Sequence, residues 1–566
     1  MLHVRNAAVL FCLSSTTRRR PEASFLAARP CLIVFMTWQR ALTTMPSLLT
    51  VVGLVLLWLA TRLWDRGNRR RAALPAHGFG RTVLSSYLVS LKNFLNTKKA
   101  VRSFADRYGG QRRFTFPLVG EWCVMCRSKE DVKDHANAHE EVLSMEAAVE
   151  KLLQTRYTVG EQFCAETYHI PAIKTSLNLN LANKLPEMLD EIARAYDEEL
   201  RVYDDWTPVF VLQVYSSLIA RVSNRVFVGA KLCRNIQYRD LVDGFSDSII
   251  RGGGLIHAFI PPSFRPVVGR LFQLVSRHHR RMVRLLSADV AERQKNRATG
   301  EKHLNPNDML EWLMDQPCDS GRHTVESLAM RLLNVNFVAL HTTTKAFTHA
   351  LYNLAARPEY LLALRDEAES LLDASNPAGW TKESLSRCVK LDSFIKESLR
   401  LNGLGAIWMP RLAVETFQFA DGTVVGPGNY VATAVTVIHE DEDNYQQAKE
   451  FDGFRFAKMS VVDEQDAGAD DMLLQAESDS RWTHRLTGAS PTYLAFGTGR
   501  HICPGRFFAS LQLKSLLALL VLRYDVRMVD EGVRPADKWL GPMSAPANAQ
   551  VLFRKRGVER RVAVGH

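Results

Sequence analysis

The sequence predicts a mainly α-helical protein with a minor β-sheet region. Apolar residues recur at helical spacing over much of the chain up to residue 400, as they do in 185–202, 278–295 and 358–372. Two strand-like segments, 113–125 and 417–437, contain or adjoin the glycine and proline residues typical of turns. The hydrophobic content is 46%, and no internal repeat divides the 566 residues, so we expect a sizeable core.

The N-terminal region predicts attachment to a membrane. Residues 47–64 carry one charge, Arg62, and about 18 apolar residues is the lower limit for crossing a bilayer. An arginine cluster opens the next segment, 65–90, which we expect to be a basic linker on the cytosolic side. No small-residue cleavage site follows, which favours an uncleaved anchor over a signal peptide, and a buried core helix is the other alternative. Residues 1–35 form an arginine-bearing extension that is either disordered or absent if translation starts at Met36.

Charge and cysteine usage narrow the classes of partner. The net charge is +12, but the basic residues are scattered and are not interleaved with stacking aromatics, so we expect no nucleic-acid partner. An anionic membrane face or an acidic protein remains. Nine cysteines without regular spacing suit a reducing compartment. Cys123 and Cys126 form a C-x-x-C without a second ligand pair, and we interpret both as structural.

Residues 324–356 predict one long, central helix. Thr324 is a suitable N-cap, Pro358 ends the helix, and residues 332–340 are apolar on nearly every side. His341 and three threonines follow, and polar groups in a buried helix need a partner or a purpose. From the residues alone, the simpler interpretation is that the threonines bond back to the preceding turn and His341 meets an acceptor in the core.

Two later segments carry charges. Glu397 and Arg400 lie three residues apart on a helix and share one face, and apolar neighbours suggest that this face is partly enclosed. Alone, such a pair is usually a weak surface ion pair. Residues 463–480 are acidic and lack periodicity, which predicts an exposed insertion.

The most informative stretch runs from Phe496 to Arg506, Phe-Gly-Thr-Gly-Arg-His-Ile-Cys-Pro-Gly-Arg. A single cysteine, Cys503, sits in a turn where glycines let the backbone pass close to a cofactor, and loop amides can hydrogen-bond a thiolate. Haem iron is the cofactor best served by one cysteine thiolate. The alternative is a buried structural cysteine.

This stretch resembles the haem-binding signature of the cytochrome P450 family at every fixed position. The resemblance covers roughly residues 90–550 and implies the cytochrome P450 fold, with the long central helix over haem and a haem-thiolate catalytic domain at 91–566. It implies that Cys503 is the axial iron ligand. It also implies a sheltering role for Phe496, a contact between His501 and a haem propionate, and cofactor-binding positions at Gly499 and Gly505.

The same resemblance gives the threonine run a function. The family has an acid followed by threonine where this helix passes over haem, and His341 and Thr342 align with these two positions. Thr342 is then the residue that positions the water delivering protons to dioxygen. A histidine at the acid position is familiar in fungal members that oxidise terpenoids. A register shift that makes Thr343 the key residue stays open.

The resemblance also implies supporting residues. Glu397 and Arg400 look like the family's Glu-x-x-Arg, which pairs with a downstream arginine, here Arg455, and stabilises the haem pocket. The family's Trp-x-x-x-Arg contact to a propionate is absent as such, and Lys174 occupies the corresponding place. Gly405, Ala406, Ile407 and Trp408 follow the Glu-x-x-Arg helix and are expected to line the substrate pocket.

By resemblance, the chain is a membrane-bound monooxygenase of the endoplasmic reticulum with a cytosolic catalytic domain. It would insert one atom of dioxygen into a C–H bond of a lipophilic secondary metabolite, with a terpenoid and specifically a diterpene as the expected substrate. Electrons would come from NADPH through cytochrome P450 reductase. The basic side chains of Arg500, Arg506 and Lys514 would steer the encounter with the acidic surface of this reductase. The alternatives are a haem-thiolate isomerase or dehydratase without a reductase, and a non-catalytic haem- or lipid-binding membrane protein.

Overall fold

The computed structural model describes Gly53 and residues 83–557, except 108–110, 119–120, 161–165, 319–322, 373–378 and 467–482. The predicted extension 1–35 and the predicted anchor 47–64, Gly53 excepted, lie outside these residues, as does the linker up to residue 82. The insertion expected at 463–480 lies outside them beyond residue 466. Within the described part of the chain, no helix has the length and hydropathy needed to cross a bilayer.

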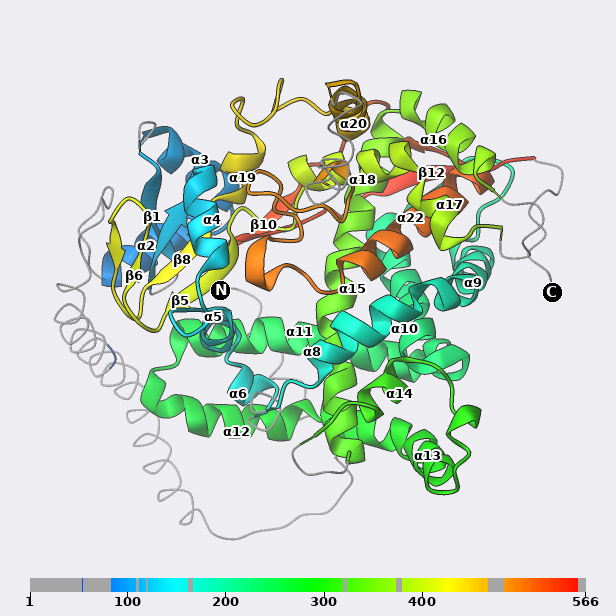
Figure 1. Ribbon diagram of the computed structural model, residues 1–566, viewed down its shortest axis with the longest axis horizontal. Helices are drawn as coiled ribbons and strands as arrows, with labels where there is room; N and C mark the ends of the chain where they lie inside the picture. Colours follow the sequence, from blue (N-terminus) through cyan, green and yellow to red (C-terminus); the bar gives the residue numbers. More distant parts are fainter. Residues whose placement is uncertain are drawn as a thin grey trace, which may run out of the picture. The chain divides into compact units, whose positions relative to one another are not determined.

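The described residues are mainly helical, as the sequence predicts (Figure 1). The α-helices are α2 (Val83–Asn93), α3 (Thr97–Arg107), α4 (Lys129–Asn137), α5 (Met145–Leu153), α6 (Thr155–Thr158), α8 (His169–Pro171), α9 (Asn178–Ala195), α10 (Val211–Cys233), α11 (Ile236–Phe259), α12 (Arg265–Ser276), α13 (His278–Ala298), α14 (Met309–Met314), α15 (Val325–Ala356), α16 (Glu359–Ser370), α17 (Lys382–Ser386), α18 (Val389–Leu401), α19 (Val435–His439), α20 (Arg455–Asp466) and α22 (Arg506–Arg523). Two π-helical turns, η1 (Ala172–Leu177) and η2 (Tyr196–Leu200), flank α9, and 3-10 turns form η3 (Pro262–Phe264), η4 (Lys302–Leu304) and η6 (Gly499–His501).

The strands form a minor part of the fold, again as predicted. They are β1 (Arg113–Leu118), β2 (Glu121–Cys126), β3 (Leu143–Ser144), β4 (Thr207–Phe210), β5 (Trp408–Ala413), β6 (Phe417–Gln418), β7 (Val424–Val425), β8 (Tyr430–Thr433), β9 (Tyr524–Met528), β10 (Lys538–Leu540), β11 (Met543–Ala545) and β12 (Gln550–Lys555). The largest sheet has the order β1-β2-β8-β5-β3, in which β2 and β8 are parallel and the other neighbours are antiparallel. The remaining sheets are β4-β12-β9, β10-β11 and β6-β7.

The two strand-like segments of the sequence fold differently from one another. Residues 113–125 form an antiparallel hairpin of β1 and β2, whereas 417–437 divides into β6, β7, β8 and the start of α19. Cys123 and Cys126 are fully buried in β2, and burial raises the pKa of both thiols. Over the described residues, no cluster of three or more metal-binding side chains forms.

Helix α15 is the long central helix that the sequence predicts. Thr324 is its N-cap, since the Thr324 hydroxyl accepts a hydrogen bond from the Ser327 amide, and the helix ends at Ala356, two residues before Pro358. It packs against α10, α13 and α18 and passes through the helical part of the molecule (Figure 1). Because α15 also packs against α22, it brings the threonine run towards the helix that follows the cysteine loop.

Candidate functional site

The cysteine loop, residues 494–506, is closed by its own backbone. The Cys503 amide donates to the Phe496 carbonyl at 2.9 Å, and the Gly497 amide donates to the Leu494 carbonyl at 2.9 Å. A third bond, from the Ile502 amide to the Gly499 carbonyl, closes the η6 turn at 3.2 Å. These bonds fix the position of the Cys503 backbone without any contribution from side chains.

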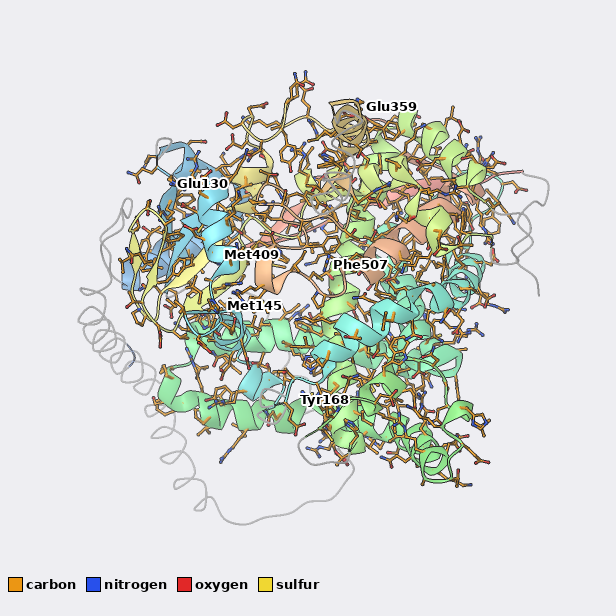
Figure 2. The ribbon with its side chains drawn as sticks, viewed as in Figure 1. Glu130, Met145, Tyr168, Glu359, Met409 and Phe507 are labelled. Carbon is orange, nitrogen blue, oxygen red and sulfur yellow. The ribbon has the colours of Figure 1, made fainter. Side chains whose placement is uncertain are left out.

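Two glycines give the loop its shape. Gly497 and Gly499 have φ angles of +69° and +71°, in the left-handed region that favours glycine. A Cβ atom on Gly499 would lie 2.4 Å from the Ala136 carbonyl oxygen, so the loop packs directly against the end of α4. Met409 of β5 lies beside Gly497, and Phe507 begins the apolar run of α22; Figure 2 labels both on the elements that flank the loop.

The sulfur of Cys503 lies where a thiolate can be stabilised. The thiol is free and partly buried, and burial raises its pKa. The amides of Gly505 and Arg506 and the positive charge of Arg506 act in the opposite direction and lower that pKa. These amides belong to the N-terminus of α22, where the helix dipole favours negative charge. The loop therefore offers a metal one sulfur with donors already directed at it.

His501 and Lys174 lie at one edge of this loop. His501 Nε2 is 2.8 Å from Glu140 Oε2, and the same carboxylate accepts hydrogen bonds from the Met145 and Glu146 amides at the start of α5. Burial lowers the pKa of His501, Glu140 opposes that shift, and the charge of Lys174 adds to it. Lys174 is exposed in η1 and is close enough to act on His501 electrostatically. His501 thus already binds a carboxylate, the chemical group that a haem propionate carries.

The middle of α15 has one open face. The Val338 side chain is 56% exposed, although Val335 and Leu340 on either side of it are buried. Thr342 shares the face of Val338 because the two are one turn apart, and the Thr342 hydroxyl donates to the Val338 carbonyl at 2.9 Å. Thr343 is 5% exposed and points into the core. The open face therefore presents Thr342, rather than Thr343.

His341 is directed towards α11. Its Nε2 atom lies 3.9 Å from Asp243 Oδ1, and burial lowers the pKa of the imidazole while Asp243 opposes the shift. Asp243 was missed by the sequence analysis because it lies in another helix, almost 100 residues earlier. No local signal in the sequence connects the two.

The structure brings Glu397, Arg400 and Arg455 together in a buried network. Glu397 accepts two hydrogen bonds from Arg400, at 2.7 and 2.8 Å, and one from Arg455 at 3.1 Å. Arg400 also donates to the carbonyls of Ala448 and Glu450, and Arg455 to those of Gln447 and Glu450. The network therefore fixes the chain that leads from α19 to α20.

His439 connects this network to the cysteine loop. Its Nδ1 lies 2.9 Å from the Arg400 carbonyl oxygen, and its Nε2 accepts a hydrogen bond from the Leu494 amide at 2.9 Å. The imidazole stacks on Tyr493 with ring centroids 5.6 Å apart. Burial lowers the pKa of His439 to about 3, so the ring is neutral and can donate through one nitrogen and accept through the other. Nothing in the sequence around His439 indicates this role.

One expectation about a charged side chain needs revision. Lys514 was expected to steer an acidic partner, but it is buried, pairs with Asp392 at 2.9 Å and donates to the Leu385 carbonyl, so this expectation was wrong. Arg500 is exposed and keeps that role as a prediction.

Of the expected pocket residues, Ala406 and Ile407 are buried in a core cluster beside the large sheet, and Trp408 begins β5 and packs against another core cluster.

The residues present fit haem. The loop supplies a single cysteine sulfur with amide donors, the edge of the loop supplies His501 for an anionic oxygen, and α15 supplies an open apolar face around Val338. Cys503 would hold the iron, and His501 and Lys174 would hold the propionates. A single cysteine thiolate as the iron ligand is the feature that defines the class of haem-thiolate enzymes.

Comparison with known proteins identifies the family. The model of the cytochrome P450 family matches residues 88–553, and the chain belongs to this family. It is 35% identical over 489 residues to cytochrome P450 monooxygenase 151 of Postia placenta, covering 86% of this chain and 94% of the relative. Cytochrome P450 monooxygenase 103 of the same fungus is 33% identical over 512 residues, covering 89% and 97%. Cytochrome P450 monooxygenase atmQ of Aspergillus flavus is 29% identical over 503 residues, covering 87% and 89%. The protein is an enzyme of the cytochrome P450 monooxygenase family, which uses haem with a cysteine thiolate as axial ligand.

Proposed function

We propose that this monooxygenase oxidises an unactivated C–H bond of a lipophilic secondary metabolite, with a terpenoid as substrate class and a diterpene as the best candidate. The observation that carries the proposal is the open face of α15, where a largely exposed Val338 stands beside the Thr342 hydroxyl. An apolar surface next to one hydroxyl suits a substrate that offers few polar groups. The histidine at position 341 adds support, since it resembles fungal members that act on terpenoids.

Different residues of the chain bind the cofactor, stabilise the thiolate and deliver protons. Bound haem supplies the oxidation chemistry, in which one atom of dioxygen enters the substrate and the other is reduced to water with electrons from NADPH through a reductase. Cys503 binds the cofactor, and the amides of Gly505 and Arg506 stabilise negative charge on its sulfur. Thr342 positions the water that delivers protons, and its bond to the Val338 carbonyl holds the hydroxyl in one orientation. His341 and Asp243 lie on the side of α15 that faces α11 and supply protons from there.

We further propose that the catalytic domain lies against the endoplasmic reticulum membrane, with the segment 47–64 as its anchor. An apolar surface on α11, η3 and α12 supports this placement, and its exposed side chains are Leu255, Phe259, Phe264, Val267 and Leu271. Helix α2, which begins within the predicted linker, exposes Leu88 and Leu91, and the turn after it exposes Leu95. Exposed apolar surface of this extent marks an interaction site, and a lipid surface would also concentrate a lipophilic substrate.

The decisive experiment combines a spectrum with turnover. The full chain is purified with haem and a NADPH-dependent reductase, the reduced carbon monoxide spectrum is recorded, and consumption of candidate diterpenes is followed with and without NADPH. We expect a thiolate-type spectrum and NADPH-dependent oxidation. A thiolate-type spectrum with turnover that needs no reductase would instead support an isomerase or dehydratase. If the wild-type chain gives no thiolate-type spectrum, the result would favour a non-catalytic haem- or lipid-binding membrane protein. Cys503→Ser is the matched control for the spectrum.

A further inference from the structure

A cavity lined by basic side chains lies away from the cysteine loop. It has a volume of about 280 Å³ and is bounded by α3, by the C-terminal ends of α15 and α18, and by the segment before β10. Five basic side chains and one acidic side chain line it, namely Lys98, Arg102, Arg357, Lys449, Arg534 and Glu440. None of the residues of the haem site lines it, so this cavity is separate from the site of the proposed function.

The positive charge in this cavity is only partly compensated. Glu440 is shared between Lys98, at 2.8 Å, and Arg102. Arg534 pairs with Asp537, which lies behind the cavity wall, at 2.8 Å. Arg357 stacks on Phe451 at 4.4 Å and donates to the Asn353 side chain, but within the described part of the chain neither Arg357 nor Lys449 has a carboxylate partner. Arg357 and Lys449 therefore form no ion pair with a carboxylate of the described residues, although the more distant charge of Glu359 acts on Arg357.

Burial disfavours the charged form of several basic side chains that line the cavity. Burial, together with the charges of Arg102, Arg534 and Arg400, lowers the pKa of Lys98 to about 8, and the charge of Asp537 opposes this shift. Burial also lowers the pKa of Arg102 and Arg357. In addition, the Nε atom of Arg534 is buried and has no hydrogen-bond acceptor among the residues that the structure describes. The cavity thus combines cations that lack a carboxylate partner with a buried donor that lacks an acceptor. A bound anion would supply both the negative charge and the acceptor.

We propose that this cavity binds a phosphate-bearing anion. Guanidinium groups bind phosphate oxygens in pairs, and lysines add point charges, so this mixture of side chains suits a multiply charged phosphate better than a single carboxylate. Lys98 and Arg102 come from α3, Arg357 follows α15, and Arg534 precedes β10, so the anion contacts elements that are far apart in the sequence. Its source is either a soluble phosphate compound or the headgroup of a membrane lipid.

Binding is expected to stabilise the fold. Leu401 and Asn402, which line the cavity, directly follow Arg400 of the buried network, and Lys98 Nζ donates to the Leu401 carbonyl at 3.5 Å. A ligand that binds only the folded state raises the unfolding temperature as its concentration rises. Thermal unfolding therefore reports binding without any reference to catalysis.

The test uses the full haem-loaded chain in detergent, titrated with pyrophosphate by calorimetry and followed by thermal unfolding. We expect saturable binding, weakened about tenfold in each of Arg357→Gln and Lys449→Gln, because each removes one charged contact. Glu440→Gln should tighten binding, since it removes the cavity's one lining carboxylate. Arg527→Gln, which removes an exposed arginine paired with Glu531 elsewhere, is the control and should leave binding unchanged.

The pH dependence provides an independent readout. An anion raises the pKa of Lys98, which faces Glu440, Arg102, Arg534, Asp537 and Arg400, so binding takes up a proton above about pH 8. The wild-type affinity should therefore fall more between about pH 7 and pH 9 than the affinity of Lys98→Arg, which stays charged. An equal pH dependence of the two proteins would count against the proposal.

Vesicles separate the two sources of phosphate. Binding to phosphatidylcholine vesicles is compared with and without phosphatidic acid, for the wild type and for Arg357→Gln. A loss of the phosphatidic acid effect in the variant identifies a lipid headgroup, whereas an unchanged vesicle response combined with weakened pyrophosphate binding identifies a soluble phosphate compound. If neither pyrophosphate nor phosphatidic acid distinguishes Arg357→Gln and Lys449→Gln from Arg527→Gln, the proposal is overturned.

Discussion

The cysteine loop and the Glu397 network are held together in different ways. Within the loop, backbone amides donate to backbone carbonyls and to the sulfur, and the bonds that close it join residues at most seven positions apart. In the network, three charged side chains bond to each other and to carbonyls, and Glu397 and Arg455 are 58 positions apart. Side-chain substitutions in the loop should therefore change chemistry more than stability, and those in the network should do the reverse.

The loop gives the largest expected effect on activity. Cys503→Ser should remove the thiolate-type carbon monoxide spectrum and reduce NADPH-dependent oxidation to background, because an alcohol does not replace the thiolate as an iron ligand. The haem-free variant should unfold at nearly the same urea concentration as the haem-free wild type, because the Cys503 amide still donates to the Phe496 carbonyl. Unfolding is followed by far-UV circular dichroism. A strongly destabilised haem-free variant would remove the contrast between the two regions.

The network gives the largest expected effect on stability. Glu397→Gln leaves two buried arginines without their carboxylate and should lower the free energy of unfolding by about 3–5 kcal/mol. The measurement is urea unfolding of the haem-free protein. Glu531→Gln removes an exposed carboxylate that also pairs with an arginine, and should change stability by less than about 0.5 kcal/mol. Similar losses in the two variants would show that the Glu397 network does not support the fold.

Helix α15 tests whether chemistry can be separated from packing within one element. Thr342→Val removes the hydroxyl on the open face and should lower kcat by about a hundredfold, with more NADPH consumed per product formed, because the positioned proton source is lost. Thr343→Val changes a neighbouring hydroxyl that points into the core and should affect kcat much less. The measurement is product formed per NADPH oxidised. The opposite ranking would assign the role to Thr343.

The smallest effect, counted per pH unit, concerns the residue that joins the two regions. Because His439 has a pKa of about 3 when folded and about 6.5 when unfolded, the unfolded state binds one more proton between these values. Stability should therefore fall as the pH is lowered through this range, by about 1.4 kcal/mol per pH unit for each such histidine. His439→Gln should reduce this slope by the contribution of one proton, which is about 1.4 kcal/mol per pH unit. Replacement of the exposed His303 should not reduce the slope. Urea unfolding at several pH values gives the slope.

Patterns within a short stretch of sequence predicted their elements well. The cap at Thr324 and the stop before Pro358 gave the bounds of α15 to within a residue, since helix ends depend on local hydrogen bonding. The helix expected at 185–202 begins earlier, at Asn178, and its last residues form a π-turn. Here tertiary packing rather than periodicity sets the ends, because α9 contacts both α10 and α22.

Contacts between distant segments could not be predicted without the resemblance. Arg455 was paired with Glu397 only through the family pattern, and nothing in the sequence connects His439 with Leu494 or His341 with Asp243. Lys514 shows the reverse error: a lysine near a functional loop was expected at the surface, but Asp392 compensates its charge in the core. Burial of a charged residue depends on a partner elsewhere in the chain, and spacing does not reveal that partner.

The close approach of Gly499 to Ala136 has a consequence for protein engineering. Two segments more than 350 positions apart meet there with no room for even one methyl group, so their backbones must be shaped for each other. Recombination of this gene with that of a relative should therefore keep α4 and the cysteine loop from the same parent. A crossover that takes these two segments from different parents would create a backbone mismatch within the cysteine loop, at Gly499.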